Sequence, residues 1–140
     1  MADIFISYAR STAAQAARVA AVLRGLGHGV WLDDELPAHR AYTDVIEERL
    51  KSAKAVVVIW SVEGAKSHWV RAEANAALEA GNLVQLTVDG VMPPMPFSQI
   101  QCADLNGWAG DTDAPGWRKV AASISDLLRA GVELARGAAS

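Results

Sequence analysis

The sequence predicts a three-layer α/β domain in which a central parallel sheet of four to five strands lies between helices. Strand-length apolar segments alternate along the chain with segments whose apolar residues recur at helical spacing. One of these strands, 55–60, is apolar throughout, which is typical of a parallel strand buried on both faces. The chain has 140 residues, a length that suits one domain with a substantial core.

Composition argues against several classes of protein. With 51% hydrophobic and 21% charged residues, the chain is expected to fold. No apolar run approaches the roughly 18 residues of a membrane helix, and the first residues lack the basic flank and apolar stretch of a secretory signal. The single cysteine, Cys102, excludes an internal disulfide and suits a reducing cytoplasm. A net charge of −3 without a basic block argues against general nucleic-acid binding.

The first part of the chain predicts two strands and two helices. A strand is expected over 3–8, where β-branched and aromatic residues follow one another. Ser11 or Thr12 caps the next helix, and a glycine-rich stretch ends it. A short strand at 30–32 leads into the polar loop 33–40 and then a second helix. The buried sides of the helices are expected to comprise Ala16, Val19, Leu23 and Leu26 in the first, and Tyr42, Val45, Ile46 and Leu50 in the second.

The rest of the chain predicts three strands and two more helices. One helix begins near Ser67 and ends at Gly81, because glycine favours the left-handed turn at a helix C-terminus. The last helix begins at Pro115. We expect a single domain over 1–136, with 137–140 as a flexible tail or the start of a linker. The strands are expected at 55–60, 83–88 and 101–105, with a proline-rich loop at 92–96; the last helix should bury Trp117, Val120, Ala121, Ile124, Leu127 and Leu128.

Ligands of open α/β sheets bind at the loops that follow the strands, so the residues of these loops indicate the chemistry. The first such loop, 7–11, contains no glycine, which excludes a dinucleotide fingerprint or a P-loop there. Trp60 and Ser61 stand where a phospho-receiver domain would need an acidic residue. Ser7 and Ser61 end strands without a Gly-x-Ser-x-Gly elbow, and we expect turn and capping roles for both.

Two further groups of residues indicate no site. The closely spaced glycines at 25–29 precede a strand instead of following one, so we interpret them as a helix end and a turn. The histidines and the cysteine have no metal-ligand spacing, and no metal is expected. These residues, which we assign to surface or loop positions, are His28, His39, His68 and Cys102.

Glu73 is the most informative residue, because helical periodicity places it among apolar side chains. Stepping about 100° per residue puts Glu73 on the sheet-facing side of its helix, one turn after Trp69. A carboxylate there is costly unless it is paired or opens into a cleft. Glu73 either pairs with an arginine, such as Arg10 or Arg40, or is a partly desolvated carboxylate in a ligand site. The predicted sheet-facing residues around it are Trp69, Val70, Ala76, Ala77 and Ala80.

Four segments occur in the order and at the distances found in Toll/interleukin-1 receptor (TIR) domains, which the chain resembles over about residues 3 to 130. They are Asp3–Arg10, Val30–Asp34 with the loop after it, Val57–Ser61 and Ser67–Glu73. The resemblance is to bacterial members and implies the flavodoxin-like TIR fold. It makes 33–41 the BB loop, which in the family mediates TIR–TIR contacts and borders the nucleotide pocket. The implied interaction residues are Asp34, Glu35, Leu36, Pro37, His39 and Arg40, where His39 replaces the glycine of many relatives.

The resemblance also implies an activity. Many TIR domains cleave NAD+ between nicotinamide and ribose with one glutamate on this helix, and Glu73 is the matching position. NAD+ is then the substrate, and no cofactor is required. Trp69, Trp31 and Tyr42 are candidates to stack on nicotinamide, and Arg10 to neutralise pyrophosphate. The complete set of residues expected at the substrate is Tyr8, Arg10, Trp31, Asp33, Tyr42, Trp60, Ser61 and Trp69.

Two functions remain open at this point. The first is an NAD+ nucleosidase of the bacterial cytoplasm that self-associates into an oligomer or filament in signalling or anti-phage defence. Its product is ADP-ribose or a cyclic ADP-ribose, between which the residues do not choose. The second is a non-catalytic adaptor that acts only through contacts with other TIR domains. Neither function involves nucleic acid or a membrane.

Overall fold

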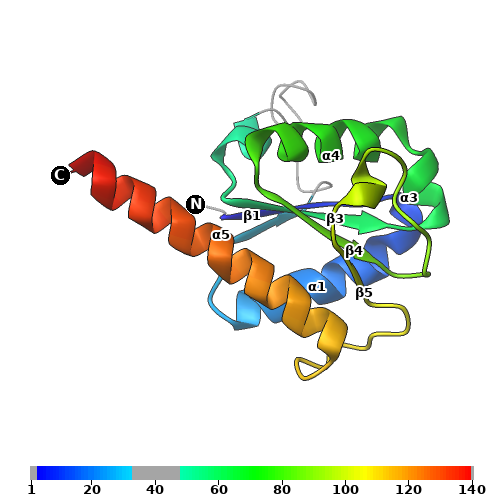
Figure 1. The fold of residues 1–140 in the computed structure, drawn as a ribbon. Coiled ribbons are helices and arrows are strands. Elements are labelled where there is room, and N and C mark those ends of the chain that lie inside the picture. Colours follow the sequence, from blue (N-terminus) through cyan, green and yellow to red (C-terminus); the bar gives the residue numbers. More distant parts are fainter. Residues whose placement is uncertain (1–2, 33–47, 140) are drawn as a thin grey trace, which may run out of the picture.

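The computed structural model describes residues 3–32 and 48–139, with side chains as far as residue 130. Five strands form one sheet in the order β2-β1-β3-β4-β5, and every neighbouring pair is parallel. Figure 1 shows this sheet between two layers of helices, which confirms the predicted architecture. The strands are β1 (Ile4–Ser7), β2 (Val30–Leu32), β3 (Ala55–Trp60), β4 (Leu83–Thr87) and β5 (Cys102–Asp104).

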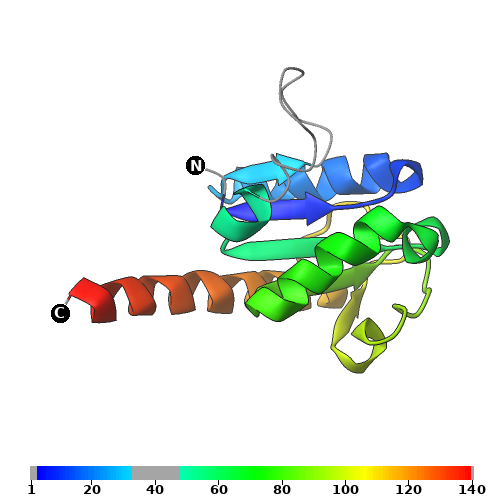
Figure 2. The same cartoon turned by 90° about the horizontal axis from the view of Figure 1, so that it is seen from above.

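Helices cover both sides of the sheet. Figures 1 and 2 show α4 on one side, α1 and α5 on the other, and the C-terminal part of α5 extending past the end of the sheet. A further helical segment occupies residues 48–52. The helices are α1 (Ala13–Gly25), α3 (Val62–Lys66), α4 (His68–Ala80) and α5 (Pro115–Ala139), with short 3₁₀ helices η1 (Arg10–Thr12) and η2 (Phe97–Gln99).

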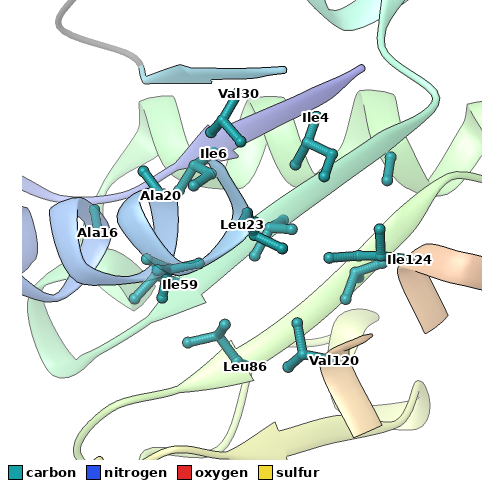
Figure 3. Close-up of a cluster of buried hydrophobic side chains, with 14 of the residues drawn as sticks. Ile4, Ile6, Ala16, Ala20, Leu23, Val30, Ile59, Leu86, Val120 and Ile124 are labelled. Carbon is teal, nitrogen blue, oxygen red and sulfur yellow. The ribbon is translucent and has the colours of Figure 1, made fainter. Parts of the chain in front are cut away.

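The side of the sheet covered by α1 and α5, here called the α1–α5 face, buries a purely apolar cluster (Figure 3). Alternate residues of each strand point to it, as the period of two in a β-strand requires. Ile4 and Ile6 of β1 contribute from the centre of the sheet, and Ile124 of α5 is fully buried in the same cluster. This face therefore supplies a large apolar core, and none of its described residues is a buried charged side chain.

The opposite side, here called the α4 face, packs Val70, Ala74 and Ala77 of α4 against the other residues of the same strands. Small alanines at the contact allow α4 to lie close to the sheet, and it contacts β1, β3 and β4. Phe5, Val56 and Val58 are the strand residues beneath it, and Trp60 and Phe97 extend the cluster toward β4. Unlike the α1–α5 face, the α4 face also buries polar side chains.

The structure confirms most of the expected elements and corrects several details. α3 was not expected, and Leu26, predicted to be buried, is 57% exposed because α1 ends at Gly25 and the chain turns away. Thr12 precedes α1 as expected, but its hydroxyl donates to the carbonyl of Ala9 instead of capping the helix. Ala80, predicted to face the sheet, is exposed, and α5 extends as far as Ala139. Tyr42, Val45 and Ile46 lie outside the described residues.

Candidate functional site

The order of the strands directs attention to the carboxyl end of β1. The chain runs from β1 to β2 on one side and continues with β3 on the other side, so the winding direction reverses at β1 and β3. In open α/β sheets, ligands bind in the crevice at such a reversal. Ser7 is the last residue of β1, and its register partner on β3 is Val58.

Helix α4 covers this end of β1, and local signals in the sequence fix both ends of the helix. At the N-terminus, the Ser67 hydroxyl accepts a hydrogen bond from the backbone N–H of Val70 at 3.2 Å. At the C-terminus, Gly81 adopts a left-handed conformation with φ of 77°, which glycine favours. Both signals were visible in the sequence, and they fix which residues of the helix face the sheet.

Glu73 lies in the middle of α4 and is only 1% exposed. The Ser7 hydroxyl donates a hydrogen bond to its Oε1 at 2.6 Å, between elements that are far apart in the sequence. This separation falls in the range of hydroxyl-to-carboxylate hydrogen bonds, which are shorter than those between neutral groups. The helical projection was therefore correct in placing Glu73 on the inner side of the helix.

The expected alternative was a salt bridge between Glu73 and an arginine. Arg10 lies exposed in η1, and no ion pair joins it to Glu73 among the residues that the structure describes. Arg40 lies outside those residues. The contact described for Glu73 is the hydrogen bond from the Ser7 hydroxyl.

Two tryptophans predicted at the substrate lie on the α4 face. Trp69 is partly buried one turn before Glu73, so the two side chains lie on the same side of α4. Trp31 of β2 is also partly buried, and the guanidinium of Arg49 stacks over its ring at 3.5 Å from the centroid. This cation–π contact, which the sequence analysis did not anticipate, occupies one face of the Trp31 ring.

Three other predicted substrate residues have structural roles here. Trp60 is fully buried, and its Nε1 donates to Oε1 of Gln85 at 2.9 Å, so its ring belongs to the core. Ser61 caps α3 by accepting a hydrogen bond from the N–H of Gly64 at 3.0 Å, which is the capping role that we expected. Tyr8 is 8% exposed and packs in the apolar cluster of the α1–α5 face, on the other side of the sheet from Glu73.

The remaining predicted residues cannot be placed. Asp33 and Tyr42, expected at the substrate, lie outside the described residues, as do all the expected residues of the interaction loop: Asp34, Glu35, Leu36, Pro37, His39 and Arg40. Within the described part of the chain, no three His, Cys, Asp or Glu side chains are arranged to hold a metal ion. None of the helices described there has the length and hydropathy of a membrane span.

The role of Ser7 was missed from the sequence. We expected a turn or cap, but its hydroxyl bonds to Glu73 across the α4 face. The alternation along β1 contained a usable signal, because Phe5 and Ser7 must face opposite to Ile4 and Ile6. What could not be read locally was that α4 would cover the side of β1 to which Ser7 points.

This geometry defines a class of protein. It is a doubly wound parallel α/β domain with a buried carboxylate beside the end of its first strand. A sequence model of TIR domains matches residues 4–121, most of the chain. The chain belongs to the TIR domain family. None of the curated protein sequences compared with it matches.

Solved structures show the same fold at low sequence identity. The TIR domain of the Toll-related receptor TRR-2 from Hydra magnipapillata superposes with a TM-score of 0.77 at 14% identity, over 89% of this chain and 99% of that one. The TIR domains of the activated Roq1 resistosome, which directly recognises the effector XopQ, give 0.61 at 17% identity over 92% and 98%. A C. gigas TIR-STING receptor bound to 2′,3′-cGAMP gives 0.68 at 21% identity over 91%; the match spans only 39% of that receptor.

Proposed function

We propose that this TIR domain is an NAD+ nucleosidase in which Glu73 acts at the bond between nicotinamide and ribose. The observation that carries the proposal is the burial of a carboxyl group, 1% exposed, beside the end of β1, where the Ser7 hydroxyl donates to it. Burying such a group is costly. A carboxyl group buried at this place in the fold, where ligands of α/β domains bind, is better explained by chemistry than by stability.

The reaction requires few protein groups besides this carboxylate. Nicotinamide leaves NAD+ as a neutral molecule from a cationic ring, so no general acid is needed to expel it. The ribose then develops oxocarbenium character, and a carboxylate in surroundings of low polarity stabilises that positive charge. Attack by water gives ADP-ribose, and attack by an adenine nitrogen gives a cyclic product. NAD+ is the substrate, and no cofactor is required.

Residues near Glu73 are suited to hold the substrate. Trp69 lies on the same side of α4 and provides an aromatic surface for the nicotinamide ring. Arg10, exposed in η1 shortly after β1, provides a positive charge for the pyrophosphate. Trp31 contributes to binding only through the ring face that Arg49 leaves uncovered.

Self-association belongs to the same proposal. The Roq1 structure contains TIR domains within an activated resistosome, and we expect an assembly of this kind to activate the present domain. Other TIR domains are therefore the proposed protein partners, with the segment 33–41 as the proposed contact loop. We also propose that the domain acts in the bacterial cytoplasm, in signalling or in anti-phage defence.

The test is chromatographic analysis of NAD+ incubated with wild type, Glu73→Gln and Glu79→Gln at high protein concentration or on a clustering support. Glu79 is a matched control, because it is an exposed carboxylate on the same helix. We expect Glu73→Gln to reduce NAD+ turnover by at least about a hundredfold, the usual effect of losing a group that stabilises transition-state charge. Glu79→Gln should match wild type. Wild-type turnover by folded Glu73→Gln would refute the assignment.

A scaffold function is the second candidate. The proline-rich loop after β4 exposes two methionines, Met92 at 74% and Met95 at 72%. Methionine is flexible and apolar, and exposed methionines adapt well to the surface of a protein partner. Such residues suit contact with another protein and take no part in NAD+ cleavage. Clustered wild-type protein that releases no nicotinamide would favour this function over the nucleosidase.

A further inference from the structure

Ser7 combines complete burial with a contact to the proposed catalytic group. Its side chain is 0% exposed, and its hydroxyl donates to Oε1 of Glu73 at 2.6 Å. Phe5, Val56 and Val58, the strand residues beneath α4, are apolar. A hydroxyl in this position does not improve apolar packing, and it bonds to a side chain and not to backbone that needs a cap.

The backbone of Ser7 is held rigidly. It belongs to β1, a central strand with parallel neighbours on both sides, and Ser7 is in register with Val58 of β3. Glu73 is held by α4, but the terminal torsion of a glutamate side chain is broad and only loosely restricted by its rotamer. The hydrogen bond from Ser7 to Oε1 restricts this terminal torsion, which the helix backbone does not.

From this geometry we infer that Ser7 is a positioning residue that orients the Glu73 carboxylate for the reaction. The inference rests on the proposed nucleosidase function. Ser7 itself does not touch the reacting atoms; it holds the carboxylate in the orientation that faces the developing charge on the ribose. Catalytic groups must be held within about half an ångström of the productive geometry, and groups on strands and helices meet that need better than groups on loops.

The consequence is a specific kinetic signature. Loss of the Ser7 hydroxyl should leave substrate binding nearly intact, because the hydroxyl lies beneath Glu73 in the interior. It should impair the step in which the ribose becomes cationic. A change confined to that step lowers kcat and leaves KM nearly unchanged. General damage to the domain would instead lower the fraction of active protein together with its thermal stability.

The experiment measures kcat and KM for NAD+ with wild type, Ser7→Ala, Ser7→Thr and Thr87→Val. Ser7→Ala removes only the hydroxyl, and Ser7→Thr retains it. Thr87→Val is the matched control, because Thr87 is a buried hydroxyl residue at the end of β4, two strands away, whose own contact is with Asp89. Thermal unfolding establishes that each variant is folded before its kinetics are compared.

We expect Ser7→Ala to lower kcat by about tenfold to a hundredfold with KM within about threefold of wild type. Ser7→Thr should recover most of the lost kcat, and Thr87→Val should match wild type. A folded Ser7→Ala variant with wild-type kcat would overturn the inference, as would an equal loss in Thr87→Val. If Ser7→Ala does not fold, Ser7→Cys keeps the volume with a much weaker donor and carries the same expectation.

The outcomes separate this inference from the function on which it rests. If clustered wild type does not cleave NAD+, the nucleosidase proposal fails, and the positioning role fails with it. If wild type cleaves NAD+ and Glu73→Gln does not, the nucleosidase stands. The kcat of Ser7→Ala then decides the positioning role by itself.

Discussion

The α1–α5 face and the α4 face bury the two sides of the same five strands with different chemistry. The first side is an unbroken cluster of aliphatic and aromatic residues. The second contains apolar residues too, but it also buries Glu73, Ser7 and Gln85. Because buried polar groups lower stability unless they are hydrogen-bonded, their concentration on one face of a small domain requires an explanation.

Gln85 and Glu73 need different explanations. The Gln85 carboxamide accepts from Nε1 of Trp60 and donates to backbone carbonyls of Phe97 and Ile100, so it fastens η2 and the chain after it to the sheet. It has a complete structural role. Glu73 accepts a hydrogen bond from the Ser7 hydroxyl on the central strand, and a buried carboxyl group adds nothing to the packing of an apolar cluster. The α1–α5 face and Gln85 therefore have structural roles, whereas Glu73 is the buried polar residue for which we propose a chemical role.

The largest stability effect is expected on the α1–α5 face. Ile124 is fully buried between α5 and the sheet, and Ile124→Ala should lower the free energy of unfolding by about 3–4 kcal/mol through lost burial and the cavity it leaves. Urea unfolding followed by circular dichroism measures this. Glu73→Gln, measured in parallel, should change stability by less than about 1 kcal/mol, because its amide oxygen can still accept from Ser7. A greater loss in Glu73→Gln would break the division between the faces.

A smaller effect is expected from Gln85→Leu. Leucine fills a similar volume but leaves Nε1 of Trp60 and the carbonyls of Phe97 and Ile100 without the partner that Gln85 supplies. We expect a loss of about 2–3 kcal/mol, the cost of a few buried groups deprived of their partner. Faster hydrogen exchange at the residues around η2 would locate the damage. An unchanged unfolding midpoint would show that Gln85 is not the fastening group.

The comparison also explains what could be predicted from the sequence. The continuous apolar run of β3 and the helical spacing around Glu73 are local patterns, and both predictions were confirmed by burial. The contact between Ser7 and Glu73 joins residues 66 positions apart. It depends on the strand order and on which side of β1 α4 covers, and neither is encoded in a local window. For the same reason, Trp60 was expected at the substrate from its place at a strand end, whereas packing directs its ring into the core.

The smallest effect concerns Cys102, at the margin of the α4 face on the edge strand β5. Burial, with a further contribution from the charge of Asp104, raises the pKa of the Cys102 thiol from 9.0 to about 11. At pH 8 the thiolate is therefore scarcer than in an ordinary cysteine, and reaction with an aromatic disulfide reagent should be about ten- to a hundredfold slower than in urea-unfolded protein.

The same shift predicts the pH dependence of stability. Because the folded state holds the thiol proton more tightly than the unfolded state, the contribution of Cys102 is fully present below pH 9.0 and is lost as the pH rises through about 11. Cys102→Ala should flatten the fall in stability between these values, which urea unfolding at pH 8, 9, 10 and 11 measures. A thiol that reacts as fast in the folded protein as in the unfolded one would show that the α4 face is open to water at its β5 margin. The close packing of the α4 face would then not extend to β5.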